Sequence, residues 1–355
     1  MGICNYGVNT ISRRRKNGEN GTDVINLIRA KEWFEMGLNT SDPEEKLLYY
    51  ARALKSNPEY VDAWIEKGNT LLELGVAESA SKSYDRALEI CPESMELRVY
   101  KGKALFAAAR YGEAVECYEK ILSREPETAE TWLNKGIAYA RMGKAQRALD
   151  CFGRAISIEP EFAKAWFSMG DTLGNMGKYK QALEAYEKGH TLDPEDAPSW
   201  TSRGKVLRKL KRHEKALEAL EKALDLNPES FVAWGSMAAS FYMLERYEEA
   251  LGACDRAIEL EPEFAGPWND RGIVLVKLGR LEEALEAYEK SLELRMDNAR
   301  TWFNMCDVLA ALGRYEDALG CYKKALKLDP GSNSSGNEKE NILQKLGKPK
   351  EALKA

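Results

Sequence analysis

The chain has 355 residues, and its charges almost balance, because 52 Lys and Arg stand against 57 Asp and Glu for a formal net charge of −5. This balance argues against a strongly cationic nucleic-acid-binding chain, and the hydrophobic fraction of 44% argues against a disordered one. The longest stretch without a charged residue has about fourteen residues, Phe231 to Leu244, which is shorter than the roughly 18 residues of a transmembrane helix. We therefore expect a soluble chain without a membrane partner.

Cysteine and histidine usage leaves few candidates for metal or disulfide chemistry. The chain has seven cysteines, none of them spaced as CxxC, and two histidines, His190 and His213. An odd number of scattered cysteines argues against a disulfide framework and a zinc module, and favours a reduced, cytoplasmic compartment. The basic run at residues 13–16 is not followed by an apolar block, so no secretory signal is expected.

Three residue types recur with one period along most of the chain. Eight of the twelve prolines, from Pro58 to Pro330, are separated by multiples of 34 residues. Seven of the eight tryptophans, from Trp64 to Trp302, have the same spacing, and an alanine follows it without a miss. A fixed period of this length is the signature of a repeat architecture, in which neighbouring repeats bury a continuous core between them.

Each period contains two segments with helical spacing. In residues 61–94 the first segment carries Trp64 and Gly68 on one face, and Gly75 marks its end. The second segment places its small and apolar residues three or four apart, and Pro92 closes it because proline cannot continue a helix. The small residues on both segments predict two closely packed helices.

The period divides the chain into three parts. Residues 1–26 are predicted to form a disordered or poorly ordered tail, because they are rich in Gly, Asn and Arg. Residues 27–332 form nine repeats of 34 residues, and residues 333–355 a partial tenth repeat that acts as the C-terminal cap. The first repeat departs from the pattern, since Trp33 lies three residues late, and we expect a shortened helical pair there as the N-terminal cap.

The pattern resembles the tetratricopeptide repeat (TPR) family. That family places Trp, Gly, Ala, an aromatic residue and Pro at set intervals, which one period of this chain matches with Trp166, Gly170, Ala182, Tyr186 and Pro194. The resemblance covers most of the chain and implies an all-α fold, a right-handed superhelical solenoid of tandem helix-turn-helix repeats. It also implies that partner proteins bind as extended peptides or helices in a groove lined by the first helices.

The family's groove positions, carried over one by one, predict a lining of mixed chemistry. The candidate partner-binding residues are Ile65, Asn69, Val99, Lys103, Phe106, Leu133, Ile137, Phe167, Asp171, Lys205, Arg208, Tyr242, Asn269, Phe303 and Asp307. The early part, Ile65 to Phe167, is apolar and suits an amphipathic helix or hydrophobic side chains. The alternative is that some of these residues contact the adjacent repeat instead.

No pattern predicts an enzyme, a cofactor site or a metal site. The sequence has no GxxxxGK[ST], HExxH or GxSxG motif. His213 stands where tyrosines stand in other repeats, and His190 stands where leucine or isoleucine does. Cys117, Cys151 and Cys321 stand where alanines do, so we interpret these histidines and cysteines as packing residues.

The leading hypothesis is a non-enzymatic scaffold that binds a partner protein in its groove. The sixth repeat, residues 197–230, leaves an alternative, because its net charge is +3 and its Lys205 and Arg208 lie at groove positions. These cations could receive an acidic or phosphorylated partner or, with less support, nucleic acid, with any catalysis in a separate chain. They could also be plain solvated cations, and self-association is a further possibility.

Overall fold

A computed structural model of the chain describes residues 21–330, which form eighteen helices and no strand. The expected all-α solenoid of tandem helix-turn-helix repeats is confirmed. The chain separates into two compact units, unit 1 (Met1–Met176) and unit 2 (Gly177–Ala355). The expected tail falls outside the described residues as far as residue 20, and the expected partial tenth repeat falls outside them altogether.

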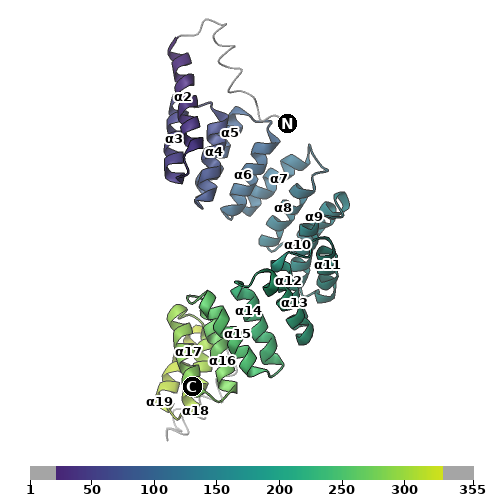
Figure 1. Ribbon diagram of the computed structural model, residues 1–355, viewed down its shortest axis with the longest axis vertical. Coiled ribbons are helices and arrows are strands. Elements are labelled where there is room, and N and C mark those ends of the chain that lie inside the picture. The colour runs from purple at the N-terminus through teal and green to yellow at the C-terminus, as the bar shows by residue number, and fades with distance from the viewer. Residues whose placement is uncertain (1–20, 331–355) are drawn as a thin grey trace. The chain divides into compact units, whose positions relative to one another are not determined.

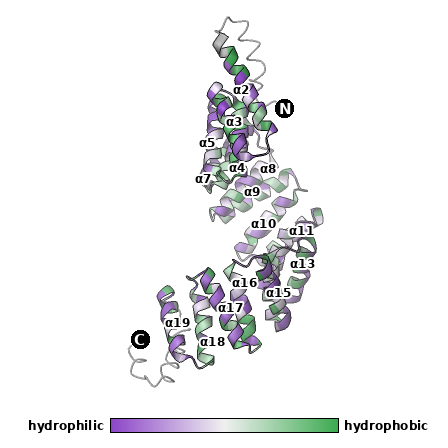
Figure 2. Cartoon of the chain, turned by 60° about the vertical axis from the view of Figure 1, so that its left-hand side comes forward, coloured by the Kyte–Doolittle hydropathy of each residue, from purple (hydrophilic) through white to green (hydrophobic). Residues whose placement is uncertain are grey.

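Unit 1 is a stack of antiparallel helix pairs that follow one another in chain order (Figure 1). Its helices are α2 (Gly21–Asn39), α3 (Pro43–Ser56), α4 (Val61–Glu73), α5 (Ala77–Ile90), α6 (Met95–Ala107), α7 (Tyr111–Leu122), α8 (Ala129–Arg141), α9 (Ala145–Ile158) and α10 (Ala163–Asn175). Hydrophilic and hydrophobic residues alternate around these helices, so each helix buries one side against its neighbours (Figure 2).

Unit 2 is built in the same way. Its helices are α11 (Tyr179–Leu192), α12 (Ala197–Lys209), α13 (His213–Leu226), α14 (Phe231–Met243), α15 (Tyr247–Leu260), α16 (Ala265–Lys277), α17 (Leu281–Leu294), α18 (Ala299–Ala311) and α19 (Tyr315–Leu328). The first helices of successive pairs contact one another, α12 with α14, α14 with α16 and α16 with α18. They therefore line one face of the unit together.

The first helix pair is not shortened, and that expectation is wrong. Helix α2 has 19 residues and begins at Gly21, ahead of the expected start at Leu27. Helix α3 begins at Pro43 because the Asp42 carboxylate accepts the Glu44 N–H at 3.0 Å and caps the helix. The late Trp33 therefore does not mark a shortened helix.

A close contact between a glycine of the first helix and a large side chain of the second joins the helices of most pairs. A Cβ atom added to Gly68 would lie 2.6 Å from the Tyr84 ring, and one added to Gly272 would lie 2.5 Å from Tyr288. In the first pair, Gly37 takes this place against Tyr50. Because real Cβ atoms do not come within 3.0 Å of a ring, only glycine fits at these positions.

A hydrogen bond connects the recurring tryptophan to the recurring proline six residues before it. The Trp64 indole N–H donates to the carbonyl oxygen of Pro58 at 2.9 Å, and the tryptophans of later repeats make the same bond. Arg98 stands at a repeat position that lacks tryptophan, and its guanidinium group donates to the carbonyl oxygen of Pro92, six residues earlier. Met296 stands at the one repeat position that lacks proline, and its carbonyl oxygen accepts a hydrogen bond from the Trp302 indole at 2.9 Å. Both departures from the pattern thus preserve the bond.

The turn between the two helices of a pair places one residue in the left-handed region of backbone space. Gly75 and Gly143 have φ angles of 74° and 73°. Three other turns hold a residue with a side chain in this conformation, since φ is 58° at Ala109, 58° at Lys211 and 59° at Glu245. An L-residue there costs roughly 1–2 kcal/mol relative to its ordinary conformations.

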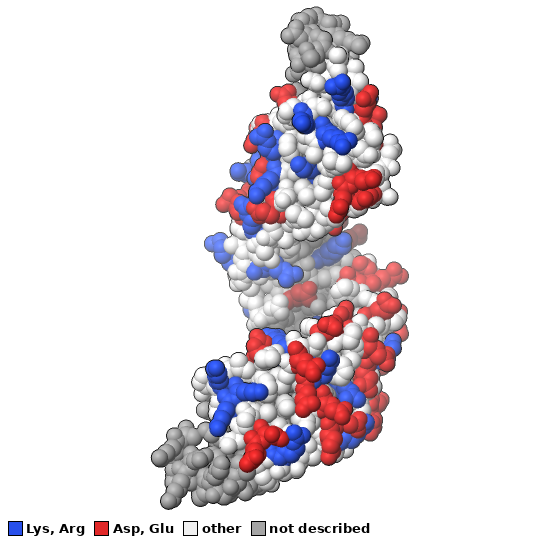
Figure 3. Space-filling model, turned by 90° about the vertical axis from the view of Figure 1, so that its left-hand side faces the viewer, with Lys and Arg blue, Asp and Glu red and all other residues white. Residues whose placement is uncertain are grey.

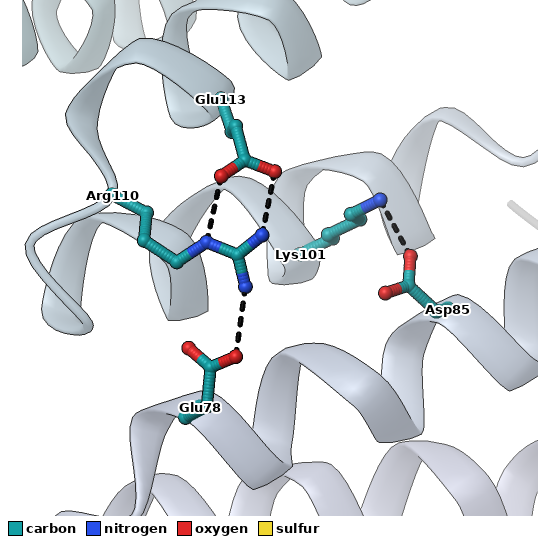
Figure 4. A network of polar contacts seen from close by, with 5 residues as sticks. All are labelled: Glu78, Asp85, Lys101, Arg110 and Glu113. Atoms are coloured by element: carbon teal, nitrogen blue, oxygen red, sulfur yellow. Dashed lines mark hydrogen bonds and ion pairs between the residues drawn. The ribbon is translucent and has the colours of Figure 1, made fainter.

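Exposed ion pairs join neighbouring repeats at their second helices (Figure 4). Arg110, just before α7, makes a two-pronged contact with Glu113 at 2.7 and 2.6 Å and reaches Glu78 of α5 at 2.9 Å. Hydrogen bonding to Glu113 raises the pKa of Arg110 and lowers that of Glu113. Because water screens these side chains, such pairs orient the repeats more than they stabilise them.

Substitution of the tightly packed glycine in α8 should destabilise the protein. In Gly136→Ala the new Cβ would lie 2.5 Å from the Phe152 ring, so we expect the free energy of unfolding to fall by roughly 1–3 kcal/mol. The measurement is urea unfolding followed by circular dichroism. The matched control is Gly153→Ala in α9, where the Cβ meets nothing within 4 Å and a gain of about 0.5–1 kcal/mol is expected. Equal effects of the two changes would contradict the packing role of Gly136.

Glycine at a strained turn should stabilise the protein. Ala109→Gly and Lys211→Gly remove the left-handed strain, which exceeds the added entropy of the unfolded chain, so each should add about 0.5–1 kcal/mol to the free energy of unfolding. The reverse change, Gly143→Ala, should lower it by about 1 kcal/mol. Thermal unfolding of the three variants checks this, and a loss of stability in both glycine variants would count against it.

Candidate functional site

Three of the residues expected to line an apolar groove in unit 1 are buried, so the prediction is wrong for them. Ile65, Leu133 and Phe167 are only 4%, 5% and 6% exposed. Ile65 packs in a core cluster with Leu97 of the next repeat, and Leu133 packs in one with Ala165 of the next repeat. The alternative, contact with the adjacent repeat, is therefore right for Ile65 and Leu133. Of the remaining apolar candidates in this unit, Val99, Phe106 and Ile137 are half-buried.

Two of the three polar candidates of unit 1 have identified partners on a neighbouring helix. The Asn69 Oδ1 atom accepts a hydrogen bond from the Tyr84 hydroxyl at 2.7 Å. The Lys103 ammonium group pairs with Glu130 at 3.2 Å, on the next first helix. Asp171 is exposed on α10. Asn69 and Lys103 thus hold helices together.

Two polar candidates of unit 2 also link helices. The Tyr322 hydroxyl donates to the Asp307 carboxylate. The Asn269 Oδ1 atom accepts from the Thr301 hydroxyl at 3.1 Å and from the Asn304 amide at 3.2 Å, which connects α16 to α18. Phe303, another candidate, is half-buried and its ring centroid lies 6.1 Å from that of Tyr322.

A cavity of about 600 Å³ lies in unit 2 around α14. Most of its lining comes from α14 and from α16 with the loop before it. The lining residues are Arg208, Phe231, Val232, Gly235, Ser236, Ala238, Ala239, Tyr242, Met243, Cys254, Phe264, Gly266, Pro267, Asp270, Ile273, Val274 and Arg300. The structure brings together two of the expected site residues here, Arg208 and Tyr242. Lys205 is exposed on α12 and is not part of the lining.

Small residues on α14 create the cavity. Gly235 stands at the repeat position that Ile65 and Leu133 hold in unit 1. Ala239 stands where other repeats carry Ile, Asn, Asp or Lys. In this repeat Ala238 opposes Cys254, in place of the usual glycine and aromatic residue. The uncharged run from Phe231 to Leu244 was the available signal in the sequence. It indicates a cavity only when its small residues are aligned with the large residues at the same positions of other repeats.

The mouth of the cavity is apolar. Phe264 is 53% exposed, Met243 52% and Val232 40%. The Phe231 and Phe264 rings meet edge to face, with centroids 5.2 Å apart. Exposed large apolar side chains that border one hollow are typical of a binding site, and pockets for ligands have volumes of roughly 300–1,000 Å³.

Three charged groups from three first helices line the cavity, Arg208 of α12, Asp270 of α16 and Arg300 of α18. Burial raises the pKa of the Asp270 carboxyl, while a hydrogen bond from Asn269 and the charges of both arginines act in the opposite direction. The Nε atom of Arg208 is buried and has no hydrogen-bond partner. Within residues 21–330, neither guanidinium forms an ion pair.

The described histidine of α11 is a packing residue. The His190 ring stacks on Trp200 with centroids 3.7 Å apart and an interplanar angle of 12°. Its Nε2 atom lies 2.8 Å from the Ser199 hydroxyl oxygen. Burial, helped by the nearby charge of Arg203, lowers the pKa of His190 to about 4. The ring is therefore neutral near pH 7.

The cysteines are also packing residues. Cys117, Cys151 and Cys321 are buried, as expected. Burial raises the pKa of the Cys151 thiol to about 11 and also raises that of Cys117, so both thiols stay protonated and are weak nucleophiles. Within residues 21–330 no group of three or more His, Cys, Asp or Glu side chains could hold a metal ion. None of the helices in that range is long and apolar enough to cross a bilayer.

Family models of the tetratricopeptide repeat match most of the chain. Models with that description match residues 42–94, 99–128, 129–162, 163–196, 197–230, 231–264, 253–286 and 299–332, and a model described as TPR repeat matches residues 274–313. Five of the matches have the length and the starting points of the repeats seen in the sequence. Among curated proteins, none matches this sequence.

Solved structures with related folds include the hetero-tetramer Cut9–Hcn1 of the APC/C, which has a TM-score of 0.60 and 19% identity over 91% of this chain and 68% of that chain. YrrB, titled as a TPR protein with an unusual peptide-binding site, has a TM-score of 0.45 and 23% identity over 53% of this chain and 96% of its own. MamA has a TM-score of 0.43 and 26% identity over 46% of this chain and 95% of its own. The likeness to the first structure shows a shared fold.

The buried histidine predicts a loss of stability in acid. Between about pH 6.5 and pH 4 the unfolded chain binds a proton at His190 that the folded chain does not, so the free energy of unfolding falls as the pH falls. The loss reaches about 3 kcal/mol by pH 4. His190→Leu, which places the residue of other repeats there, should remove this part of the pH dependence. Urea unfolding of both proteins at pH 7, 5.5 and 4 measures it, and parallel stability profiles would rule it out.

Proposed function

The chain belongs to the tetratricopeptide repeat family, and we propose that it is a non-enzymatic scaffold that binds an extended segment of a partner protein in the cavity around α14. The observation that carries this proposal is the open cavity of about 600 Å³ with Phe264 and Met243 exposed at its mouth. Such a surface loses water favourably when an apolar side chain enters it.

The side chains in the cavity favour binding over catalysis. Burial raises the pKa of the Cys254 thiol, so this cysteine is not an activated nucleophile. The Ser236 hydroxyl donates to the Val232 carbonyl oxygen at 2.8 Å and has no basic partner within the site. The six described cysteines are free thiols, which is compatible with the reducing cytoplasm that we propose as the compartment.

The nucleic-acid alternative has less support than a protein partner. Arg208 belongs to an apolar cavity rather than to an open basic stripe. Acidic side chains gather along one side of unit 2 (Figure 3), and the repeat that contains α14 and α15 carries more acidic than basic residues. A phosphate backbone carries a negative charge at every nucleotide, so it would be repelled along the whole of this acidic side, unlike a single carboxylate held inside the cavity.

Filling the cavity should abolish peptide binding. A random twelve-residue peptide library displayed on phage is selected on the full chain, and the affinities of the selected peptides are measured by fluorescence anisotropy. Gly235→Leu should weaken them roughly tenfold or more, because the new side chain occupies the cavity, and a Cβ on Gly235 meets nothing within 4 Å.

The matched control is Gly252→Leu on α15. A Cβ there also meets nothing within 4 Å, but Gly252 does not line the cavity. Both variants replace a helical glycine, which favours the helix by about 0.5–1 kcal/mol. If the selected peptides bind the two variants equally well, or if no peptide is selected, the proposed function is wrong.

A further inference from the structure

We infer that the segment bound in the cavity is an acidic one, which inserts a large apolar side chain over Gly235 and Ala239 and places a neighbouring Asp or Glu carboxylate between Arg208 and Arg300. This inference rests on the proposed function and names the chemistry of the partner. It depends on the charges of the cavity, on a hydrogen-bond donor of Arg208 that has no acceptor, and on the small apolar residues in the lining.

The cavity holds more positive than negative charge. Arg208 and Arg300 come from helices on opposite sides of the α14–α16 pair, and both line the same hollow. Asp270 is the acidic residue in that lining, and both arginines act on it electrostatically. One carboxylate between two guanidinium groups leaves an excess positive charge that a second carboxylate would balance.

The hydrogen bonding of Arg208 points to the same occupant. Its Nε atom is buried and lacks an acceptor. A guanidinium group presents donors in a planar fork that matches the two oxygens of a carboxylate, and such a pair is stronger where water is excluded. An amide would satisfy fewer donors, and an ammonium group would be repelled. An incoming Asp or Glu side chain therefore supplies what the fold leaves open.

The apolar part of the segment follows from the shape of the cavity. Gly235 and Ala239 line the cavity at positions where other repeats carry larger side chains, and Phe264 and Tyr242 also belong to its lining. An aromatic or large aliphatic side chain would cover this surface, in the manner of an anchor residue. Because the arginines line the same hollow, the anchor and the carboxylate belong to neighbouring residues of the partner.

The composition of the selected peptides is the first test. The library described above should return peptides in which Asp or Glu stands beside Phe, Trp, Leu or Met. Replacing that acid by its amide in the best peptide should weaken binding to the unmodified protein roughly tenfold. If the peptides lose affinity for Gly235→Leu but carry no acid, or tolerate its replacement by Lys, the inference is wrong while the proposed function stands.

Protein variants supply the second test. Arg208→Gln and Arg300→Gln should each weaken the acidic peptide roughly tenfold, and should change the binding of its amide analogue by less than about twofold. Arg256→Gln on α15, where Arg256 pairs with Glu259 outside the cavity, is the matched control and should leave both affinities unchanged. Arg300 is exposed, so Arg300→Gln remains informative if Arg208→Gln impairs folding.

A third variant predicts a gain. Asp270→Asn removes the carboxylate that competes for the arginines, so the acidic peptide should bind roughly threefold more tightly, whereas a residue with a purely structural role would give a loss. Circular dichroism and thermal unfolding confirm that each variant is folded. Unchanged affinity of the acidic peptide across all three cavity variants would overturn the inference.

Discussion

The contact between a glycine of the first helix and a large side chain of the second is the constraint on which the repeat depends. At Gly68, Gly136 and Gly272 even one methyl group would lie within 2.6 Å of a ring atom. The two helices can approach this closely only because one of them lacks a side chain there. The ring is then buried between them, and each pair presents a surface on which the next pair can stack.

A local change in this contact produces the cavity. Where Ala238 opposes Cys254, neither glycine nor an aromatic ring is present, and Gly235 and Ala239 on the same helix add no bulk on the exposed side. The volume that large side chains fill elsewhere is left open to a ligand. In the function that we propose, a single repeat thus becomes a binding site through the loss of packing atoms rather than the gain of special groups.

The charges of the protein serve two different purposes. The ion pairs at the starts of second helices, such as Arg110 with Glu113 and Arg280 with Glu283, are exposed and contribute mainly to orientation. Arg208, Asp270 and Arg300 lie in an apolar hollow, where an unbalanced charge interacts more strongly with a ligand. The same residue types therefore have different effects because the surrounding medium differs.

The amino-acid sequence by itself determined the repeat, its period and the helical character of each segment. These features depend on the spacing of apolar residues and on turn residues that lie close together in the chain. It also marked His190, Cys117, Cys151 and Cys321 as packing residues, since the repeat shows what normally stands in their places. It could not assign the groove. Ile65, Leu133 and Gly235 share one repeat position, yet the first two are buried by packing and the third borders a cavity. Only the tertiary structure decided between these outcomes, because the exposure of a side chain depends on the size of the residues that neighbouring helices place against it.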